Sequence, residues 1–298
     1  MNKKIYITGS SGFVGENLVS YLTNLNFPLK TLNRTELTDI SLDGMAIVHL
    51  AGKAHDLKKT SNPEEYYQVN YELTKKLYDA FLKSDARKFI FISSVKASAD
   101  IIDGVLTEDD VPNPITDYGK SKLMAELYIQ SQPLPANKSY FILRPCMIHG
   151  PGNKGNLNLL YKFVQKGIPY PLASFENKRS FLSVENLCFV IANLLKKDIP
   201  SGIYNVADDE ALSTNEVVGI LASSINKKPK LWAIPTKVIR GLAKIGDVFR
   251  LPLNTERLDK LTENYMVSNK KLIDVLQLEL PLKSKQGLSI TAKSFKNL

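Results

Sequence analysis

The feature that most constrains the fold lies at the N-terminus, where a short apolar run is followed at once by three glycines. Residues 4–8 have the β-branched and aromatic character of a buried strand, and Gly9, Gly12 and Gly15 come directly after them. The segment 12–25 then has helical periodicity. In a strand–loop–helix unit, such glycines permit a tight turn, a close approach of the backbone to a ligand and close packing of the helix on the strand. The start of the chain therefore predicts a βαβ unit of a parallel sheet.

Short strand-like runs alternate with longer helical segments over the first 206 residues. We predict six strands, at residues 4–8, 29–32, 46–50, 88–93, 140–143 and 203–206, and four helices, at residues 12–25, 63–83, 117–130 and 184–196. This alternation is typical of an α/β fold with a doubly wound parallel sheet, the Rossmann arrangement.

The remaining sequence forms two pieces that lack this alternation. Ligands of doubly wound sheets bind beyond the carboxyl ends of the strands, so a lobe built from these pieces would close over the ligand. We predict a dinucleotide-binding Rossmann domain of residues 1–150 plus 179–206, and a smaller C-terminal substrate lobe of residues 151–178 plus 207–298.

Composition excludes several other classes of protein. No apolar run approaches the roughly 18 residues of a membrane span, so none is expected. Cys146 and Cys188 lack the spacing of a metal site and indicate buried thiols in a reducing compartment, the cytoplasm. The net charge of +9 comes from scattered lysine pairs that indicate solvated helix faces, so no nucleic-acid partner is expected.

One segment of the second lobe, residues 236–254, is basic and amphipathic. Ile239, Leu242, Ala243 and Phe249 can share one face of a helix there. We predict an ordinary helix packed on the second lobe, because Gly241 and other breakers in the segment weaken any long free helix. A helix that lies on a membrane surface is the alternative.

The glycine loop, Gly9-Ser10-Ser11-Gly12-Phe13-Val14-Gly15, predicts a dinucleotide site. A helix N-terminus offers unpaired N–H groups and a partial positive charge, both of which suit a diphosphate. The tip of the second strand distinguishes the two common cofactors, because an acid there suits NAD and an arginine suits NADP. Arg34 stands at this tip, so we expect NADP, with NAD as the alternative.

A tyrosine and a lysine form the candidate proton-transfer group. Tyr118 and Lys122 lie four residues apart at the start of a predicted helix and therefore share a face. A fixed ammonium should lower the pKa of a nearby tyrosine from its usual value near 10. Ser93 and Ser94 end a buried strand in the same crevice region, where a hydroxyl can polarise a substrate oxygen.

Taken in order, these motifs resemble the extended short-chain dehydrogenase/reductase family, in its branch of nucleotide-sugar epimerases, dehydratases and 4-keto reductases. The resemblance covers nearly the whole chain. Its further landmarks are His49-Leu50-Ala51-Gly52, Asn70, Ala125-Glu126, Leu143-Arg144-Pro145, Gly150-Pro151-Gly152, Arg179-Ser180-Phe181 and Val184-Glu185-Asn186-Leu187.

The resemblance implies roles for individual residues. Tyr118 would be the catalytic acid/base, Lys122 would hold the nicotinamide ribose, and Ser94 would bond the reacting sugar oxygen. Further cofactor contacts would come from Phe13, Val14, Asp39, Ile40, Leu50, Ala51 and Gly52, and substrate diphosphate contacts from Asn156 and Arg179. A homodimer formed through helices 63–83 and 117–130 is also implied.

Departures from the family pattern narrow the reaction. The family's 4,6-dehydratases carry Thr-Asp-Glu where this chain has Ser94-Val95-Lys96, so dehydration is not expected. His149 replaces a family tyrosine, and we interpret it as a packed polar residue. We predict hydride transfer at C4 of a UDP-sugar, foremost by a 4-keto-sugar reductase for surface-polysaccharide sugars. The alternatives are a UDP-hexose or N-acetylhexosamine 4-epimerase with retained NAD, and a non-catalytic NADP-binding sensor or scaffold.

Overall fold

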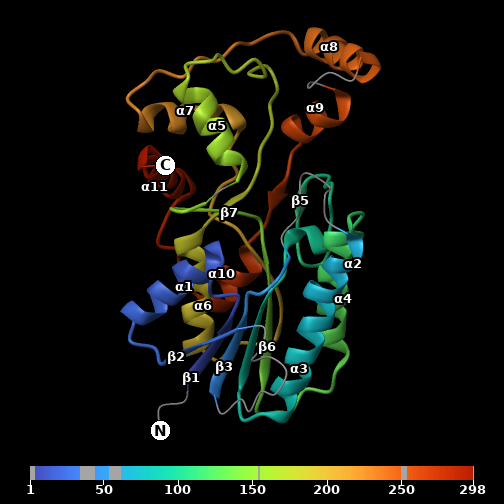
Figure 1. Cartoon of the computed structure of the whole chain (residues 1–298), viewed down its shortest axis with the longest axis vertical. Helices are drawn as coiled ribbons and strands as arrows, with labels where there is room; N and C mark the ends of the chain where they lie inside the picture. The colour runs from blue at the N-terminus through green and yellow to red at the C-terminus, as the bar shows by residue number, and fades with distance from the viewer. Residues whose placement is uncertain (1–3, 34–43, 54–61, 154, 250–253, 298) are drawn as a thin grey trace.

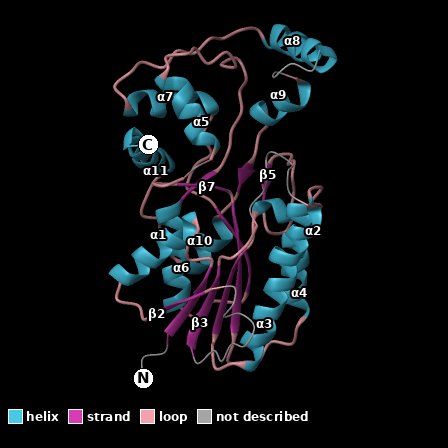
Figure 2. Cartoon of the chain, in the orientation of Figure 1, coloured by secondary structure: helices cyan, strands magenta, loops and turns pink. Residues whose placement is uncertain are grey.

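A computed structural model describes residues 4–33, 44–53, 62–153, 155–249 and 254–297 (Figure 1). A sheet with helices on both faces forms one part of the molecule, and a mainly helical part lies beyond one end of that sheet (Figure 2). The α/β class predicted from the sequence is confirmed.

All six predicted strands are present, and they form one sheet in the order β2-β1-β3-β4-β6-β9. Every neighbouring pair is parallel. The order reverses beside β1, and this is the point where doubly wound sheets bind ligands. The strands are β1 Lys4–Thr8, β2 Leu29–Leu32, β3 Gly44–His49, β4 Lys88–Ile92, β6 Ser139–Pro145 and β9 Gly202–Val206.

Alternate side chains of the strands enter two different cores, because successive residues of a strand point to opposite faces. Ile5 and Ile7 of β1 pack with helices α1 (Phe13–Asn24) and α6 (Val184–Lys196). Tyr6 packs on the other face, with α3 (Leu73–Lys83) and α4 (Asp117–Ser131). The helices therefore cover both faces, as Figure 1 shows.

The helix predicted at residues 63–83 changes its winding in the middle. It begins as α2 (Pro63–Tyr66), where the Asn62 side chain accepts a bond from the Glu64 amide at 3.1 Å. It continues as a π-helical turn, η2 (Tyr67–Glu72), and ends as α3. Such turns are rare and frequently mark functional positions. This one buries Asn70 completely.

The second part of the molecule has its own apolar core. This core joins residues of α5, α7, α8, α9 and α11 with Tyr170, Leu172 and Phe181.

The elements of the described chain not yet given are α5 Asn156–Gln165, α7 Thr214–Ser224, α8 Thr236–Phe249, α9 Thr255–Thr262, α10 Lys270–Leu276, α11 Ser284–Ser294, η3 Val95–Ala97, η4 Phe295–Asn297 and the short strands β5 Val105–Leu106, β7 Met147–His149, β8 Phe181–Ser183 and β10 Met266–Val267.

Helix α8 departs in part from its prediction. It forms over Thr236–Phe249 and contributes Ile239 and Ala243 to the core, as expected. Leu242 and Phe249, predicted on the same face, are instead 49% and 72% exposed. Successive helix residues point 100° apart, so the apolar side chains of α8 spread over a wide face. Only the part of this face that contains Ile239 and Ala243 packs against the lobe. Within the described ranges, no helix combines the length and apolarity needed to cross a membrane.

Candidate active site

Two glycines of the loop, Gly9 and Gly15, lie where backbone segments approach each other closely. Gly9 has a φ of +70°, and a Cβ atom there would lie 2.6 Å from the amide nitrogen of Ala51, which follows β3. A Cβ atom on Gly15 would overlap the carbonyl oxygen of Gly9. These two positions therefore accept only glycine without a shift of the backbone.

The second glycine has a different surrounding. Gly12 is the N-cap of α1 with extended φ and ψ, and no side chain caps this helix end. A Cβ atom there would meet only the Gly9 carbonyl oxygen, at 3.4 Å. The amides of the first turn of α1, which include those of Phe13 and Val14, therefore remain for an anionic ligand. This cradle fits the diphosphate of a dinucleotide.

The candidate catalytic residues meet in a cavity of about 250 Å³ beyond the carboxyl ends of β3, β4 and β6. Its lining comes from α1, from the ends of β4 and β6 and the segments that follow β3, β4 and β6, and from α4. The residues are Val14, Leu50, Gly52, Lys53, Ile92, Ser93, Ser94, Tyr118, Lys122, Pro145, Cys146 and Ile148. The structure thus brings the predicted residues Val14, Leu50, Gly52, Ser94, Tyr118 and Lys122 together, and places Ala51 against Gly9.

Tyr118 is partly buried in the wall of this cavity. Burial raises its pKa above the ordinary value of 10, and a hydrogen bond from the Ser94 hydroxyl opposes this increase. The sequence-based expectation of a lowered pKa is therefore wrong for this structure. Burial disfavours the charged phenolate, and the Lys122 ammonium is directed elsewhere, with Nζ donating to the carbonyl oxygen of Ile92 at 2.9 Å.

Lys122 is itself buried, with 4% of its surface exposed. Desolvation lowers the pKa of its ammonium from 10.5 to about 8, against the opposing charge of Glu126. The ammonium lies 4.8 Å from the ring centre of Phe91, whose π face attracts a cation. The lysine thus remains mostly protonated at pH 7 and loses its proton as the pH rises through about 8.

A buried ion pair lies one helical turn beyond Lys122. The Arg144 guanidinium of β6 bonds Glu126 of α4 with an Nη2–Oε2 distance of 2.6 Å, and both side chains are almost fully buried. The Ser93 hydroxyl also donates to the Glu126 carboxylate. The Ser93 hydroxyl is therefore engaged by Glu126, although Ser93 also lines the cavity, and Ser94 is the hydroxyl that bonds Tyr118. The strand pattern alone did not separate these two serines, and it was the family resemblance that named Ser94.

Asn70 is a positioning residue whose role the sequence reasoning missed. Its amide accepts from the Lys53 amide at 2.8 Å and donates to the Ser121 hydroxyl at 3.1 Å. It therefore ties the loop after β3 to the helix that carries Tyr118. A Cβ atom on Gly52 would lie 3.0 Å from both Asn70 Oδ1 and Lys122 Nζ. The only sequence signal for this role was that Asn70 matches a landmark position of the resembled family.

Asn156 and Arg179 line a second, larger cavity of about 590 Å³ in the helical lobe. Its wall is mainly apolar, with Leu157, Phe163 and Tyr170 among its residues. The Arg179 guanidinium bonds the carbonyl oxygens of Lys260 and Glu263 and lies 3.5 Å from the Glu263 carboxylate. The structure therefore brings the two predicted substrate residues into one cavity, separate from the catalytic one.

Three predicted cofactor contacts, Arg34, Asp39 and Ile40, lie outside the described residues.

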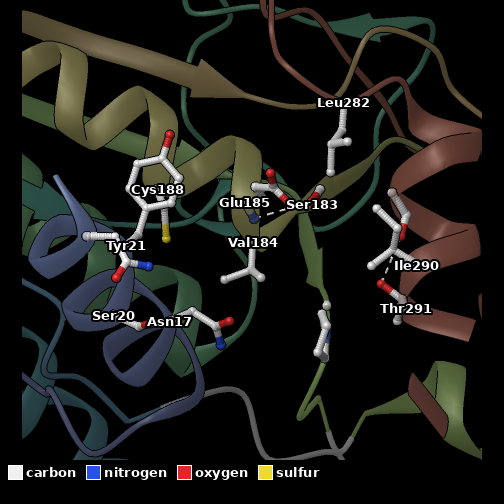
Figure 3. Close-up of a pocket in the computed structure, with 14 residues that line it drawn as sticks. Asn17, Ser20, Tyr21, Ser183, Val184, Glu185, Cys188, Leu282, Ile290 and Thr291 are labelled. Atoms are coloured by element: carbon white, nitrogen blue, oxygen red, sulfur yellow. Dashed lines mark hydrogen bonds between the residues drawn. The ribbon is translucent and has the colours of Figure 1, made fainter. Parts of the chain in front are cut away.

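Another pocket, of about 210 Å³, lies between α1, α6 and α11 (Figure 3). Asn17, Tyr21 and Cys188 face it, and none of the predicted site residues lines it.

His149 is packed, as interpreted from the sequence. Its ring is fully buried and bonds the Thr291 hydroxyl at 2.8 Å. His149 is therefore not among the residues that line the catalytic cavity.

A sequence model of the NAD dependent epimerase/dehydratase family matches residues 5–207 of this chain. The chain belongs to this family. A UDP-glucose 4-epimerase of Vibrio cholerae is 30% identical over an alignment of 323 positions, gaps included, which covers 99% of this chain and 96% of that protein. A GDP-6-deoxy-D-mannose reductase of Pseudomonas aeruginosa is 24% identical over an alignment of 261 positions, gaps included, which covers 80% of this chain and 86% of the reductase.

A solved structure shows the same fold. RMD from Pseudomonas aeruginosa, complexed with NADPH, superposes with a TM-score of 0.76 at 20% identity, over 99% of this chain and 100% of that one. The family model and the relatives show that the chain is an NAD(P)-dependent enzyme of the epimerase and reductase type, with a nicotinamide dinucleotide as its cofactor. The alternative of a non-catalytic sensor or scaffold is therefore not supported.

Two glycine substitutions should separate packing from cofactor binding. Gly15→Ala should lower the free energy of unfolding by about 1–3 kcal/mol, because the new methyl group overlaps the Gly9 carbonyl. Gly12→Ala should change stability by less than about 1 kcal/mol, yet weaken dinucleotide binding about tenfold or more, because its methyl group stands at the open end of α1. Urea unfolding and calorimetric titration measure the two effects. Equal stability losses in both variants would contradict this assignment.

The lowered pKa of Lys122 predicts a pH-dependent stability. Between about pH 8 and 10.5 the unfolded chain binds more protons at this lysine than the folded chain, so the free energy of unfolding should rise with pH in that window. Relative to Lys122→Met, the wild-type protein should gain about 2–3 kcal/mol between pH 7.5 and 10. Urea unfolding of both ligand-free proteins at each pH measures this gain. A difference that stays constant over the range would refute it.

Proposed function

We propose that the protein is an NADPH-dependent reductase of a 4-keto sugar carried on UDP, in the synthesis of surface-polysaccharide sugars. The observation that carries this proposal is the Tyr118 hydroxyl, which is bonded by Ser94 and whose pKa is raised by burial. Reduction of a ketone requires a proton donor beside the oxygen that receives the proton. A neutral tyrosine is that donor.

The residues of the cavity divide the chemistry between them. The nicotinamide of the bound cofactor supplies the hydride. Tyr118 gives its hydroxyl proton to the sugar oxygen at C4, while the Ser94 hydroxyl turns from Tyr118 to donate to the same oxygen and orient it. Lys122 would hold the ribose of a bound cofactor and, as a cation beside the cavity, would stabilise negative charge that develops on the phenolate oxygen.

The residues at positions 95 and 96 support reduction over dehydration. Val95 is buried, and the Lys96 ammonium turns to the carbonyl oxygen of Asp100, at 2.8 Å, and to the Tyr265 ring. Neither residue lines the catalytic cavity. The acid and base that water elimination requires are therefore not supplied from these two positions.

We assign the substrate diphosphate to the second cavity. The guanidinium of Arg179 suits a diphosphate, because its planar donors match phosphate oxygens, and Asn156 adds an amide on the same wall. A UDP carrier is favoured because the Vibrio cholerae relative is named for UDP-glucose.

A 4-epimerase that retains NAD is the second candidate. It is favoured by the same Vibrio cholerae relative, which is a UDP-glucose 4-epimerase and aligns over 99% of this chain. The same residues would serve it, with Tyr118 first removing the proton from the C4 hydroxyl and later returning it. Retained NAD would then regenerate in each cycle.

The nucleotide that co-purifies with the protein distinguishes the two reactions. For a reductase, mass spectrometry should find little bound NAD, and a UDP-4-keto-6-deoxy-N-acetylhexosamine should oxidise added NADPH. Tightly bound NAD, with conversion of UDP-glucose or UDP-N-acetylglucosamine and no added cofactor, would refute the reductase.

Replacement of the proton donor tests the enzyme mechanism. Tyr118→Phe should lower kcat about 10²–10⁴-fold with little change in stability. Tyr128→Phe, the same change on the same helix but outside the cavity lining, is the matched control and should keep kcat. Full activity of Tyr118→Phe would exclude the proposed role.

We also propose a homodimer in the cytoplasm. The η2–α3 and α4 helices pack side by side, and α4 leaves Leu127 55% exposed on its outer side. Cys146 and Cys188 are buried and free, as expected in a reducing compartment. Light scattering should give twice the chain mass of 33.3 kDa, and Leu127→Glu should give a monomer. A monomeric wild-type protein would contradict the dimer.

A further inference from the structure

Helix α8 is only shallowly embedded in the protein. It lies at the end of the molecule farthest from the N-terminus, next to α9 (Figure 1). Over its 14 residues it buries only Ile239, Ala243 and Gly246. These positions recur at a spacing of four and then three residues, which defines one narrow seam along the helix. The rest of its circumference faces solvent.

A second apolar seam runs along the exposed part of α8. Val238, Leu242, Ile245 and Phe249 recur at spacings of four, three and four residues, so they lie in one row. Each is about half exposed or more, and Phe249 is 72% exposed. We call this row the α8 stripe. Four large apolar side chains in one exposed row exceed the scattered single residues that are normal on a protein surface.

The neighbouring sector of α8 is basic. Lys237, Arg240 and Lys244 recur at spacings of three and four residues, and all three are exposed. Arg240 lies 3.6 Å from Asp259, at a site where both side chains are more than half exposed. Within the described part of the chain, Lys237 and Lys244 have no ion-pair partner. The apolar row thus has a row of cations beside it.

The chain that leads into α8 adds a further large apolar side chain to this end of the molecule. Trp232, four residues before the helix, is 56% exposed. Tryptophan is enriched at membrane interfaces, where an apolar ring can enter the lipid while its N–H stays in contact with water.

We propose that the α8 stripe docks this protein on the surface of an anionic membrane. A helix that lies in the plane of a lipid interface has an apolar face with lysines and arginines beside it. Here the stripe would enter the boundary between headgroups and acyl chains, and Lys237, Arg240 and Lys244 would meet the lipid phosphates. The charge favours lipid over an apolar protein partner, because such a partner leaves Lys237 and Lys244 without counter-charges. The net charge of +9 acts in the same direction.

This surface is separate from both cavities. None of the four stripe residues lines the catalytic cavity or the cavity that holds Arg179. The inference therefore does not depend on the reaction proposed above, and stripe variants should keep the basal activity.

Co-sedimentation of the full-length protein with lipid vesicles tests the proposal. The vesicles contain either phosphatidylcholine alone or an equal mixture with phosphatidylglycerol, in 0.1 M salt. Wild-type protein should partition at least about tenfold more strongly onto the anionic vesicles, and 0.5 M salt should release it. The triple variant Leu242→Ser, Ile245→Ser, Phe249→Ser should lose at least about tenfold of this partitioning. The pair Lys237→Glu, Lys244→Glu should do the same.

A matched control replaces exposed apolar residues elsewhere. Ile101→Ser with Val111→Ser removes side chains that are 72% and 89% exposed outside α8, and this variant should bind vesicles as the wild-type protein does. Thermal unfolding and dinucleotide binding should be the same in all variants. Equal partitioning of wild type and stripe variant overturns the proposal. A stripe variant that changes the oligomeric mass but not vesicle binding also overturns it, and identifies a protein interface instead.

Discussion

The ion pair between Arg144 and Glu126 is the interaction on which the arrangement of the catalytic cavity depends. It joins β6 to α4 where neither side chain can reach water. A buried charge that loses its partner is strongly destabilising, so the two elements are fixed relative to one another. The carboxylate also engages Ser93, which leaves the next serine to face Tyr118. One buried carboxylate therefore fixes the position of α4, which carries Tyr118, and separates the surroundings of the two serines.

Desolvation determines the charge state of the cavity. Burial raises the pKa of Tyr118 and lowers that of Lys122 to about 8, so both shifts favour the uncharged form. His49, at the end of β3, shows the same effect, because burial lowers its pKa to about 3 and leaves a neutral ring between the hydroxyls of Thr8 and Thr74. At neutral pH, Tyr118 and His49 are thus uncharged, whereas Lys122, with a pKa of about 8, keeps most of its positive charge.

Most of the sheet and the main residues of the cavity could be predicted from the sequence, because both follow from local patterns. The strands were visible as apolar runs, and the spacing of Tyr118 and Lys122 placed them on one helix face. Three features could not be predicted. The π turn at Asn70 has no distinct periodicity, the pKa of Tyr118 depends on burial by distant segments, and the exposure of Leu242 and Phe249 depends on how little of α8 the lobe covers.

The Arg179 side chain caps the C-terminal end of α9, and this couples the second cavity to that helix. Its guanidinium bonds the carbonyl oxygens of Lys260 and Glu263, which lie at the C-terminal end of α9. Carbonyls at a helix end have no partner within the helix. A ligand that recruits this guanidinium must therefore take it, in whole or in part, from α9. Because α9 packs against α8, occupancy of the cavity and the seating of both helices are thermodynamically linked, and each must affect the other by the same free energy.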